Sequence, residues 1–530
     1  MSSAPTITGA RPASVEIARS APVGLGRVLA IGLIVEAALL FGLTWPLRIW
    51  QSPDAITESE PLSAMLGQTT AGFARFVATL VIWGAGYALI CHISRRPFTD
   101  GARRALFLFP IVFALTLVPT WAAASKDVYH YVLEGRTLVV YGESPLTTPP
   151  AAFPDDPLRW IVSSWEWEPS RYGPLWAQIA AVPVWVAGDH LRAAVLGFKV
   201  IGVVSFLAIV ALVYATARRV RPDLAIPAFV FVAWNPLLLF ESAANAHNDI
   251  VMVAFTALAL YCAARRNWTL AFPALAAAVL VKFTTGLLGP LLLIWAWQTT
   301  RGRPVERRQI IVGLGLAVCL TVVCYALFWT GADTFRALTG AAGDALNSPG
   351  WLLREVLERL GVSERAAGIV VTLPLALLFA AAYIVLLRGT KSGDRLPSGS
   401  AGILPASMSS DRTFPSFVWC GVAALTAYLW LASWWFWPWY VTWVLPLAAL
   451  LAGQPIARFT LLWSLGAMAA YIPITFRPFF WGEPPDDRMP LAVTVTVFGP
   501  AALYALLALR RRLRQRARSN SPAEPASPHT

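Results

Sequence analysis

The first residues that could do chemistry follow an apolar run at 105–124. Segment 125–136 reads SKDVYHYVLEGR, and helical spacing would place Asp127, Tyr131 and Glu134 on one face. A carboxylate held among aromatic rings at a membrane surface is a candidate general base. An ordinary interfacial helix, anchored by its tyrosines, accounts for the same residues equally well.

A second polar group lies between two apolar runs, in the segment 241–249, ESAANAHND. It contains Asn245, His247, Asn248 and Asp249, where a short turn needs only one or two polar residues. Because ionisable groups at membrane depth are costly, they are usually functional. The alternative is helix capping by Asn248 or Asp249. His247 and Asp249 are too few to make a metal site, and none is predicted.

Lysine is rare in this chain, which has four lysines in all. Lys282 ends the apolar run 268–284 and would suit an anionic lipid phosphate as a point charge. Lys199, inside the run 193–217, is a second candidate for the same phosphate. Snorkelling of the lysine side chain to the membrane interface is the alternative for Lys282.

An aromatic segment at 434–440 reads WWFWPWY. An aromatic belt at the membrane interface is the favoured interpretation. Stacking of sugar rings on these side chains is the alternative.

The elements that must position these groups are membrane helices. The chain of 530 residues is 57% hydrophobic and only 13% charged, whereas a soluble domain carries roughly 25% charged residues. We therefore predict an all-α polytopic membrane protein with about 14 transmembrane helices. The predicted spans are 28–49, 73–93, 105–124, 193–217, 225–242, 248–264, 268–284, 286–300, 309–330, 366–388, 415–433, 435–453, 457–475 and 489–510.

The net charge of +13 indicates cytoplasmic loops rather than nucleic-acid binding, because such loops collect arginine. If the N terminus is inside, the arginine clusters after spans two, four, six, eight and fourteen all fall inside. Both termini are then cytoplasmic, and the long segment 125–192 lies on the outer face with interfacial helices. One such helix is predicted at 155–165, and 174–188 is predicted to be re-entrant or interfacial, since it is short and contains Pro183.

The predicted organisation is a cytoplasmic tail at 1–27, a membrane domain at 28–510 and a basic cytoplasmic tail at 511–530. Within the membrane domain, 125–192 is the outer catalytic loop and 389–414 is a flexible cytoplasmic linker. The sequence lacks a GxxxxGK[ST] motif and a Rossmann fingerprint placed after a strand, which argues against nucleotide-driven chemistry.

These motifs resemble those of bacterial polyprenyl-phosphomannose-dependent mannosyltransferases, within the GT-C superfamily. The similarity is closest to the actinobacterial α-1,6-mannosyltransferases of lipoglycan assembly and extends from about span two through span eight. Two departures, Gly142-Glu-Ser-Pro145 and Ser170-Arg171, fall in the loop expected to shape the acceptor pocket. The resemblance rests on Asp127-x-Tyr-x-Tyr, Gly135-Arg136, Tyr172-Gly-Pro-Leu175, Trp234-Asn-Pro, His247-Asn-Asp249 and Val281-Lys-Phe283.

The resemblance implies a GT-C-like bundle in the bacterial plasma membrane that catalyses inverting sugar transfer on the outer face. The donor would be a polyprenyl-phosphate sugar, most simply mannose, and the acceptor a glycan or glycolipid, with no cofactor or metal. Asp127 would take the proton of the acceptor hydroxyl. Lys282, with Arg136 or Lys199 as alternatives, would stabilise the phosphate charge.

The remaining residues of the resemblance are expected to bind substrate. His247, Asn248 and Asp249 would orient hydroxyl groups, and Arg171 and Tyr172 would help to close the pocket. Tyr129 and Tyr131 are further candidates for substrate contact.

A flippase for a lipid-linked sugar is the main alternative, because it needs the same phosphate-binding cations but no base. The transferase hypothesis makes one spatial prediction. Asp127, the turn that ends at Asp249, and Lys282 should line one pocket facing away from the cytosol.

Overall fold

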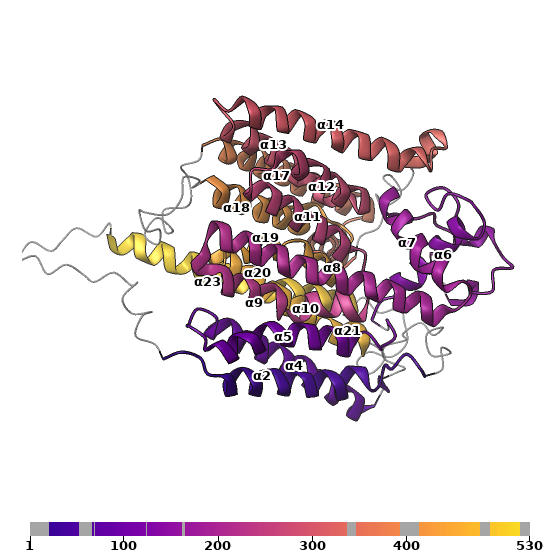
Figure 1. Ribbon diagram of the computed structural model, residues 1–530, viewed down its shortest axis with the longest axis horizontal. Helices are drawn as coiled ribbons and strands as arrows, with labels where there is room; N and C mark the ends of the chain where they lie inside the picture. Colours follow the sequence, from indigo (N-terminus) through magenta and orange to yellow (C-terminus); the bar gives the residue numbers. More distant parts are fainter. Residues whose placement is uncertain are drawn as a thin grey trace, which may run out of the picture.

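The computed structural model describes residues 21–51, 66–67, 69–122, 124–161, 165–335, 346–392, 413–476 and 488–519. Over these residues the chain is helical and contains no strand, only isolated bridges such as that between Val23 and Phe98. Most helices run side by side in one bundle, and a lobe carrying α6 (Asp127–Val139) and α7 (Pro174–Ala187) projects from one end (Figure 1). The prediction of an all-α fold is confirmed.

Eight helical stretches of the described chain are long and apolar enough to cross a membrane, or nine if one bent pair counts as a span. The predicted count of about 14 is not confirmed. The eight are Leu25–Thr44, Thr70–Ile93, Leu191–Val220, Pro304–Ala326, Glu364–Thr390, Thr413–Ala432, Pro455–Thr475 and Arg488–Gln515.

Most of the other predicted spans are shorter or interrupted helices. The run at 435–453 divides into a 3-10 helix, η10 (Pro438–Trp443), and the short α19 (Leu445–Ala449). The remaining short helices are α5 (Asp100–Leu117), α11 (Asp249–Ala264), α12 (Trp268–Val281) and α13 (Leu288–Thr299).

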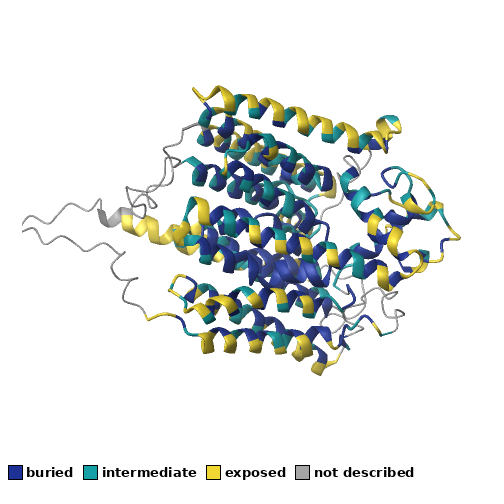
Figure 2. Ribbon diagram, in the orientation of Figure 1, coloured by how far each residue is buried: buried dark blue, intermediate teal, exposed yellow. Residues whose placement is uncertain are grey.

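Burial accounts for the apolar composition of the shorter helices. Helices α9 (Ala225–Ala233) and α11 are buried along most of their length, and they lie inside the bundle, which is exposed at its periphery (Figure 2). A helix surrounded by protein is apolar on every side, just as one in lipid is. By contrast, only 17% and 11% of the apolar windows of α14 (Pro304–Ala326) and α17 (Glu364–Ser392) are buried.

The Trp234-Asn-Pro motif breaks the predicted span 225–242. The Asn235 side chain accepts a hydrogen bond from the backbone N–H of Leu238, and Pro236 opens α10 (Pro236–Leu239). This is a standard helix start, because proline lacks the donor that the first turn leaves unused. The Asn235 amide also donates to the Tyr87 and Ser464 hydroxyls.

The break bends the helix axis by 53° between Pro222–Ala233 and Pro236–Ala244. The second half continues as the π-helix η6 (Phe240–Ala244). The residues after the bend lead directly into the polar segment that contains His247.

The lobe is built by close packing of α6 on α7. A Cβ atom on Gly135 would lie 2.8 Å from the Ala180 carbonyl oxygen, so the glycine allows this approach. Helix α7 has 14 residues, about 21 Å, and is too short for a hydrocarbon core of about 30 Å.

The helix predicted at 155–165 is absent from its described part, which instead has a single 3-10 turn, Arg159–Ile161. Leu158 and Ile161 are buried, but Trp165 is exposed with a φ of 65°. A left-handed residue cannot continue a helix, and residues 162–164 lie outside the described chain.

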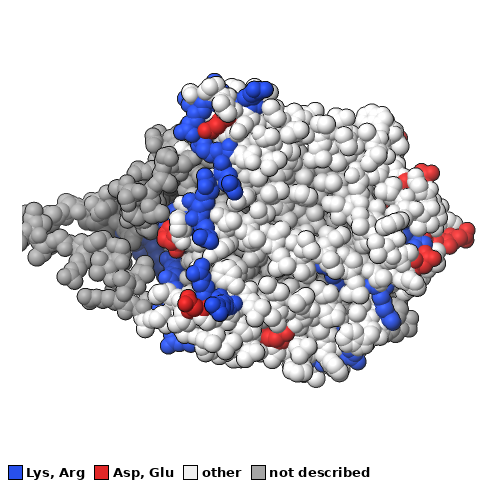
Figure 3. Space-filling view, viewed as in Figure 1, with Lys and Arg blue, Asp and Glu red and all other residues white. Residues whose placement is uncertain are grey.

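The predicted tails and linker lie partly outside the described residues. Residues 1–20, 393–412 and 520–530 are not described. Helix α17 extends to Ser392, into the predicted linker, and α23 (Arg488–Ser519) continues through the arginines of the predicted tail. Lysine and arginine gather at the end of the bundle opposite the lobe (Figure 3).

Candidate active site

Asp127, in the first turn of α6, is surrounded by hydroxyl groups. The Ser125 hydroxyl donates to its Oδ1 at 3.0 Å, and the Tyr172 and Tyr131 hydroxyls donate to its Oδ2 at 3.1 and 3.4 Å. His247 Nε2 lies 3.7 Å from the same Oδ2. The Asp127 side chain is 26% exposed, so the carboxylate is held in place and is still reachable.

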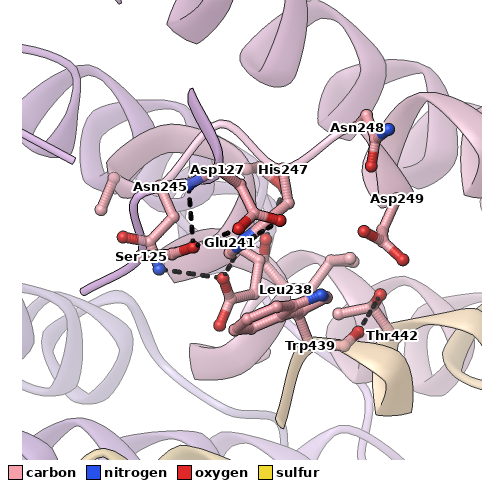
Figure 4. A network of polar contacts seen from close by, with 12 residues as sticks. Ser125, Asp127, Leu238, Glu241, Asn245, His247, Asn248, Asp249, Trp439 and Thr442 are labelled. Carbon is pink, nitrogen blue, oxygen red and sulfur yellow. Dashed lines mark hydrogen bonds and ion pairs between the residues drawn. The ribbon is translucent and has the colours of Figure 1, made fainter. Parts of the chain in front are cut away.

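His247 is fixed from behind by a second carboxylate. Its Nδ1 lies 2.6 Å from Glu241 Oε2, and both side chains are fully buried. The Glu241 carboxylate also accepts from the Asn245 amide at 2.9 Å and from the Tyr471 hydroxyl at 2.5 Å. The carboxylate favours a proton on Nδ1 and thereby directs Nε2 toward Asp127 (Figure 4).

Two opposing effects act on the His247 imidazole. Burial disfavours the charged ring, but the nearby Glu241, Asp127 and Asp249 carboxylates outweigh it and raise the pKa of His247 above its usual value. The ring also stacks on Trp439, with centroids 4.2 Å apart. The Glu241 contact and the Trp439 ring therefore hold the His247 imidazole in a fixed orientation, with its Nε2 beside Asp127.

Lys282 follows α12 and forms the cationic side of the site. Its ammonium lies 2.8 Å from Asp249 Oδ1. It also lies 5.5, 4.7 and 5.3 Å from the ring centroids of Tyr172, Tyr440 and Trp443. Aromatic faces attract a cation without neutralising it, so these rings stabilise the ammonium in addition to its ion pair with Asp249.

Tyr172 joins the acid to the cation. Its hydroxyl bonds to Asp127, and its ring packs against Lys282. Gly173 makes this possible, because its N–H donates to the Val281 carbonyl at 3.0 Å and a Cβ would lie 2.0 Å from the Leu280 carbonyl oxygen. The start of α7 is thus docked onto the end of α12, immediately before Lys282.

The polar turn carries buried atoms without hydrogen-bond partners among the described residues. They include both amide atoms of Asn248, Oδ2 of Asp249 and Nε2 of His247. Asn248 occupies the N-cap position of α11, yet its side chain makes no capping bond, so capping does not explain it. Unpaired buried polar groups each cost about 1–3 kcal/mol, which favours a ligand-binding role.

The backbone of this turn is strained. Ala246 has a φ of 57°, a left-handed conformation that non-glycine residues seldom adopt. Such strain concentrates at functional sites.

Lys199 has its donors occupied within the protein. Its ammonium donates to the Thr120 hydroxyl at 2.9 Å and to the Ala243 and Ala244 carbonyls at 3.1 and 2.6 Å. These bonds join α8 (Leu191–Val220) to η6. Lys282 is therefore the stronger candidate for the donor phosphate.

Arg136 is buried and ion-paired within the lobe. Its guanidinium lies 2.7 Å from Asp156 Oδ2 and 2.7 Å from Asp189 Oδ1. Tyr141 also donates to Asp156 at 2.8 Å. These contacts give Arg136 a structural role in the lobe, and a role with phosphate stays a prediction.

The structure brings most of the other predicted residues into the site. The Tyr131 ring packs edge-on against Tyr172, with centroids 5.4 Å apart. Arg171 lies 4.4 Å from the Trp165 ring centroid, at the edge of the lobe. Tyr129 is buried in the hydrophobic core, and no hydrogen bond of the described residues joins it to another predicted site residue.

Sequence reasoning missed part of the site. Trp439 and Tyr440 belong to the aromatic segment 434–440, which was interpreted as a lipid belt, and Trp443 follows that segment. Trp439 stacks on His247, and the rings of Tyr440 and Trp443 lie beside the Lys282 ammonium. Glu241 was noticed only as the start of the polar segment. Two features of the sequence could have indicated these residues. Pro438 interrupts the aromatic segment, and the Glu241 carboxylate lies six residues before His247.

Glu134 is a second buried carboxyl on α6. Burial raises its pKa to about 8, although the Ser170 hydroxyl opposes the shift and Asp127 adds to it. Glu134 is therefore largely protonated at neutral pH, whatever its role.

Comparison with known proteins assigns the chain to a family. A model of the family described as alpha-(1->6)-mannopyranosyltransferase, N-terminal domain, matches residues 29–299. The match covers just over half of the chain and includes Asp127, His247 and Lys282. This chain belongs to the alpha-(1->6)-mannopyranosyltransferase family.

Two similar proteins come from actinobacteria. The chain is 25% identical to alpha-(1->6)-mannopyranosyltransferase A of Corynebacterium glutamicum over 52% of its own length and 61% of the relative's length. It is 24% identical to alpha-(1->6)-mannopyranosyltransferase A of Mycobacterium tuberculosis over 77% of each chain.

The family model ends before the aromatic segment at 434–440. Asp127 and Lys282 thus both lie inside the matched part. Trp439, Tyr440 and Trp443 come from the remaining part of the chain. Among the described residues of this family member, no group of three or more His, Cys, Asp or Glu side chains is arranged to hold a metal ion.

Proposed function

We propose that this protein transfers a mannosyl group from a polyprenyl-phosphate donor to a hydroxyl of a glycan acceptor, with inversion at the anomeric carbon. The names of its relatives support mannosyl transfer. The observation that carries the proposal is that Tyr172 contacts both charged groups, since its hydroxyl donates to the Asp127 carboxylate and its ring lies beside the Lys282 ammonium.

The reaction needs a base and an anion-binding cation on opposite sides of the anomeric carbon. Asp127 accepts the proton of the acceptor hydroxyl as that oxygen bonds to the carbon. The bond from the same carbon to the phosphate oxygen breaks, and the electron pair leaves with the polyprenyl phosphate. Lys282 stabilises the phosphate charge that develops.

The buried Glu241–His247 pair supports the base. Because the pKa of His247 is raised, its charged form places a positive charge 3.7 Å from Asp127 Oδ2. This charge stabilises the ionised carboxylate before proton transfer. Asn248 and Asp249 present unpaired polar atoms to which sugar hydroxyls can bond.

The distribution of charge supports a reaction on the outer face. Lysine and arginine gather at the end of the bundle opposite the lobe (Figure 3), and membrane proteins keep such residues in the cytoplasm. In this orientation the α6–α7 lobe and Asp127 face away from the cytosol, in a bacterial plasma membrane.

The test is transfer by the purified protein. Incubation with polyprenyl-phosphomannose and short mannose oligomers should lengthen the oligomer by one unit, as measured by mass spectrometry, and NMR should show the inverted anomer. Asp127→Asn should lower kcat by about 10²- to 10⁴-fold while the lipid still binds.

Asp155→Asn is the matched control, since Asp155 is an exposed carboxyl in the same lobe, and it should retain wild-type turnover. Lipid translocation in proteoliposomes without glycoside formation would favour the flippase. Wild-type turnover in D127N would exclude Asp127 as the base.

A further inference from the structure

An open cavity lies at the end of the bundle opposite the lobe, where lysine and arginine gather (Figure 3). It has a volume of about 360 Å³ and is lined by Asp100, Arg103, Arg104, Phe107 and Tyr214. The first four residues belong to the start of α5, and Tyr214 belongs to the last part of α8. We call this space the basic cavity.

The arginine side chains of the basic cavity are available to a ligand. Arg104 is exposed, and no hydrogen bond or ion pair joins its side chain to another residue of the described chain. Arg103 Nη2 donates to the Tyr214 hydroxyl at 3.2 Å. The Arg218 guanidinium lies 5.8 Å from the centroid of the Tyr214 ring. Three arginines thus surround the cavity with Asp100 as its one lining carboxylate, and this balance favours an anion.

Aromatic rings fix the wall of the basic cavity. The Phe107 ring stacks on Phe229 of α9, with centroids 4.0 Å apart, and meets the Tyr214 ring edge-on at 5.2 Å. Tyr214 and Phe229 are also in contact, with centroids 5.9 Å apart. These rings join α5, α8 and α9, so the wall exists before any ligand binds and little freedom is lost on binding.

An exposed apolar stripe leads away from the basic cavity along α5. Leu108, Ile111 and Leu115 follow Arg104 at helical spacing, and all three are exposed. The distance from Arg104 to Leu115 along the helix is about 16 Å. This is close to half of a hydrocarbon core of about 30 Å, so the stripe has the depth of one leaflet.

Helix α8 carries a similar stripe. Val204 and Leu207 are exposed, and helical spacing places Leu207 on the same face as Tyr214 and Arg218. Each of the two helices that line the cavity therefore combines an exposed apolar face with an arginine at its end. Acyl chains pack on such faces while a phosphate group reaches the arginine.

We propose that the basic cavity binds the headgroup of an anionic phospholipid, with the phosphate at Arg103 and Arg104 and the acyl chains along the stripe of α5. Guanidinium groups suit phosphate because they donate two parallel hydrogen bonds. Basic pockets between membrane helices on the cytoplasmic side bind lipid headgroups of this kind. The Asp100 carboxylate can accept hydrogen bonds from the hydroxyl groups of a glycerol headgroup.

The competing explanation is that these arginines only orient the chain in the membrane. Orientation requires positive charge in the cytoplasmic loops, but it requires neither a cavity nor an apolar stripe. Arg103 and Arg104 lie inside a helix and line a cavity with aromatic walls. Arg301 and Arg308 are also exposed but are not part of the basic cavity, so they serve as the comparison.

The experiment is native mass spectrometry of the purified full-length protein in detergent. The probes are dioleoyl phosphatidylglycerol and dioleoyl phosphatidylethanolamine, which differ in net charge and share their acyl chains. The wild-type protein should bind phosphatidylglycerol about tenfold more tightly. Changing Arg103→Gln and Arg104→Gln together should weaken phosphatidylglycerol binding by about fivefold per arginine and leave phosphatidylethanolamine binding unchanged.

The matched control changes Arg301→Gln and Arg308→Gln together, which removes the same number of charges outside the basic cavity. It should keep the wild-type affinity for phosphatidylglycerol. Arg104→Glu alone should fold normally, because its side chain has no hydrogen bond or ion pair within the described chain, and should abolish the preference for phosphatidylglycerol. Equal affinity of the wild-type protein for both lipids, or equal losses in the two double variants, would overturn the inference.

Competition with glycerol 3-phosphate distinguishes a lipid from a soluble phosphate. This compound carries the phosphate but lacks the acyl chains, so it should not displace phosphatidylglycerol at equal concentration. Displacement would show that the stripe of α5 contributes nothing and would refute a lipid site. The measurement needs no turnover, so its outcome is independent of the proposed function.

Discussion

At the scale of single residues, the site depends on how two charges are held close together. Lys282 pairs with the buried Asp249 and lies over three aromatic rings. Asp127 is held by hydroxyl groups and faces His247. Tyr172 contacts both groups.

Lys282→Gln should lower kcat by about 10²- to 10³-fold, because the leaving phosphate loses its cation. The same change leaves the buried Asp249 carboxylate without its cation, although the Trp443 indole N–H still donates to it, so the variant should also lose stability, by about 3 kcal/mol. Activity is measured by mannosyl transfer and stability by thermal unfolding.

The double variant K282Q/D249N separates the two effects, since it removes both charges. It should regain much of the lost stability and still fail in catalysis. Recovered activity in the double variant would contradict the role assigned to Lys282.

Glu134 makes stability depend on pH. Its pKa is raised from 4.5 to about 8, so between these values the folded protein binds a proton that the unfolded chain has released. Stability therefore falls as pH rises through this window, and the loss is complete above about pH 8. Glu134→Gln should be more stable than wild type at pH 8.5, on the order of a few kcal/mol.

The measurement is the thermal midpoint of both proteins across this pH range. The difference between them should disappear near pH 4.5. A difference that does not change with pH would show that ionisation of Glu134 is not its cause.

At the scale of elements, two breaks in helical structure place the chemistry. The cap at Asn235 bends the buried helix by 53° and leads into the His247 turn. Gly173 docks α7 onto the end of α12 and sets Tyr172 beside Lys282. Both breaks lie in motifs that were visible in the sequence.

Gly173→Ala should disturb the site through this docking contact. The added Cβ would lie 2.0 Å from the Leu280 carbonyl oxygen, so α7 must shift, at a cost of about 1–3 kcal/mol. Because Tyr172 would move with it, kcat should fall on the order of 10²-fold. Transfer assays and thermal unfolding test both effects.

Gly289→Ala is the control for this change. Gly289 lies in the first turn of α13 and has open space around its Cβ position. Alanine there should leave activity unchanged and should not lower stability. Equal damage by both substitutions would argue against the docking contact.

At the scale of the whole molecule, charge and burial divide the protein into distinct regions. The lobe with the candidate active site lies at one end, and lysine and arginine gather at the other (Figure 3). The central helices are enclosed by the peripheral ones (Figure 2).

Cysteine labelling tests the orientation. With the five native cysteines replaced by serine, Glu143→Cys should react with an impermeant maleimide in intact cells, because the lobe faces outward. Arg301→Cys, at an exposed position in the turn after α13, should react only after the membrane is opened. The reverse pattern would place Asp127 on the cytoplasmic side.

The chain's sequence determined that this is an all-helical membrane protein, and it identified Asp127, the 247–249 turn and Lys282. Polar residues between apolar runs stand out because burying them is costly without a function. Only the tertiary structure decided the helix lengths, the pairing of Glu241 with His247 and the place of Trp439 and Trp443. The sequence of an apolar helix does not show whether lipid or protein surrounds it, because both surroundings favour apolar side chains. The sequence likewise does not show whether a tryptophan lies at the membrane interface or beside a histidine, because its ring is buried favourably in both places.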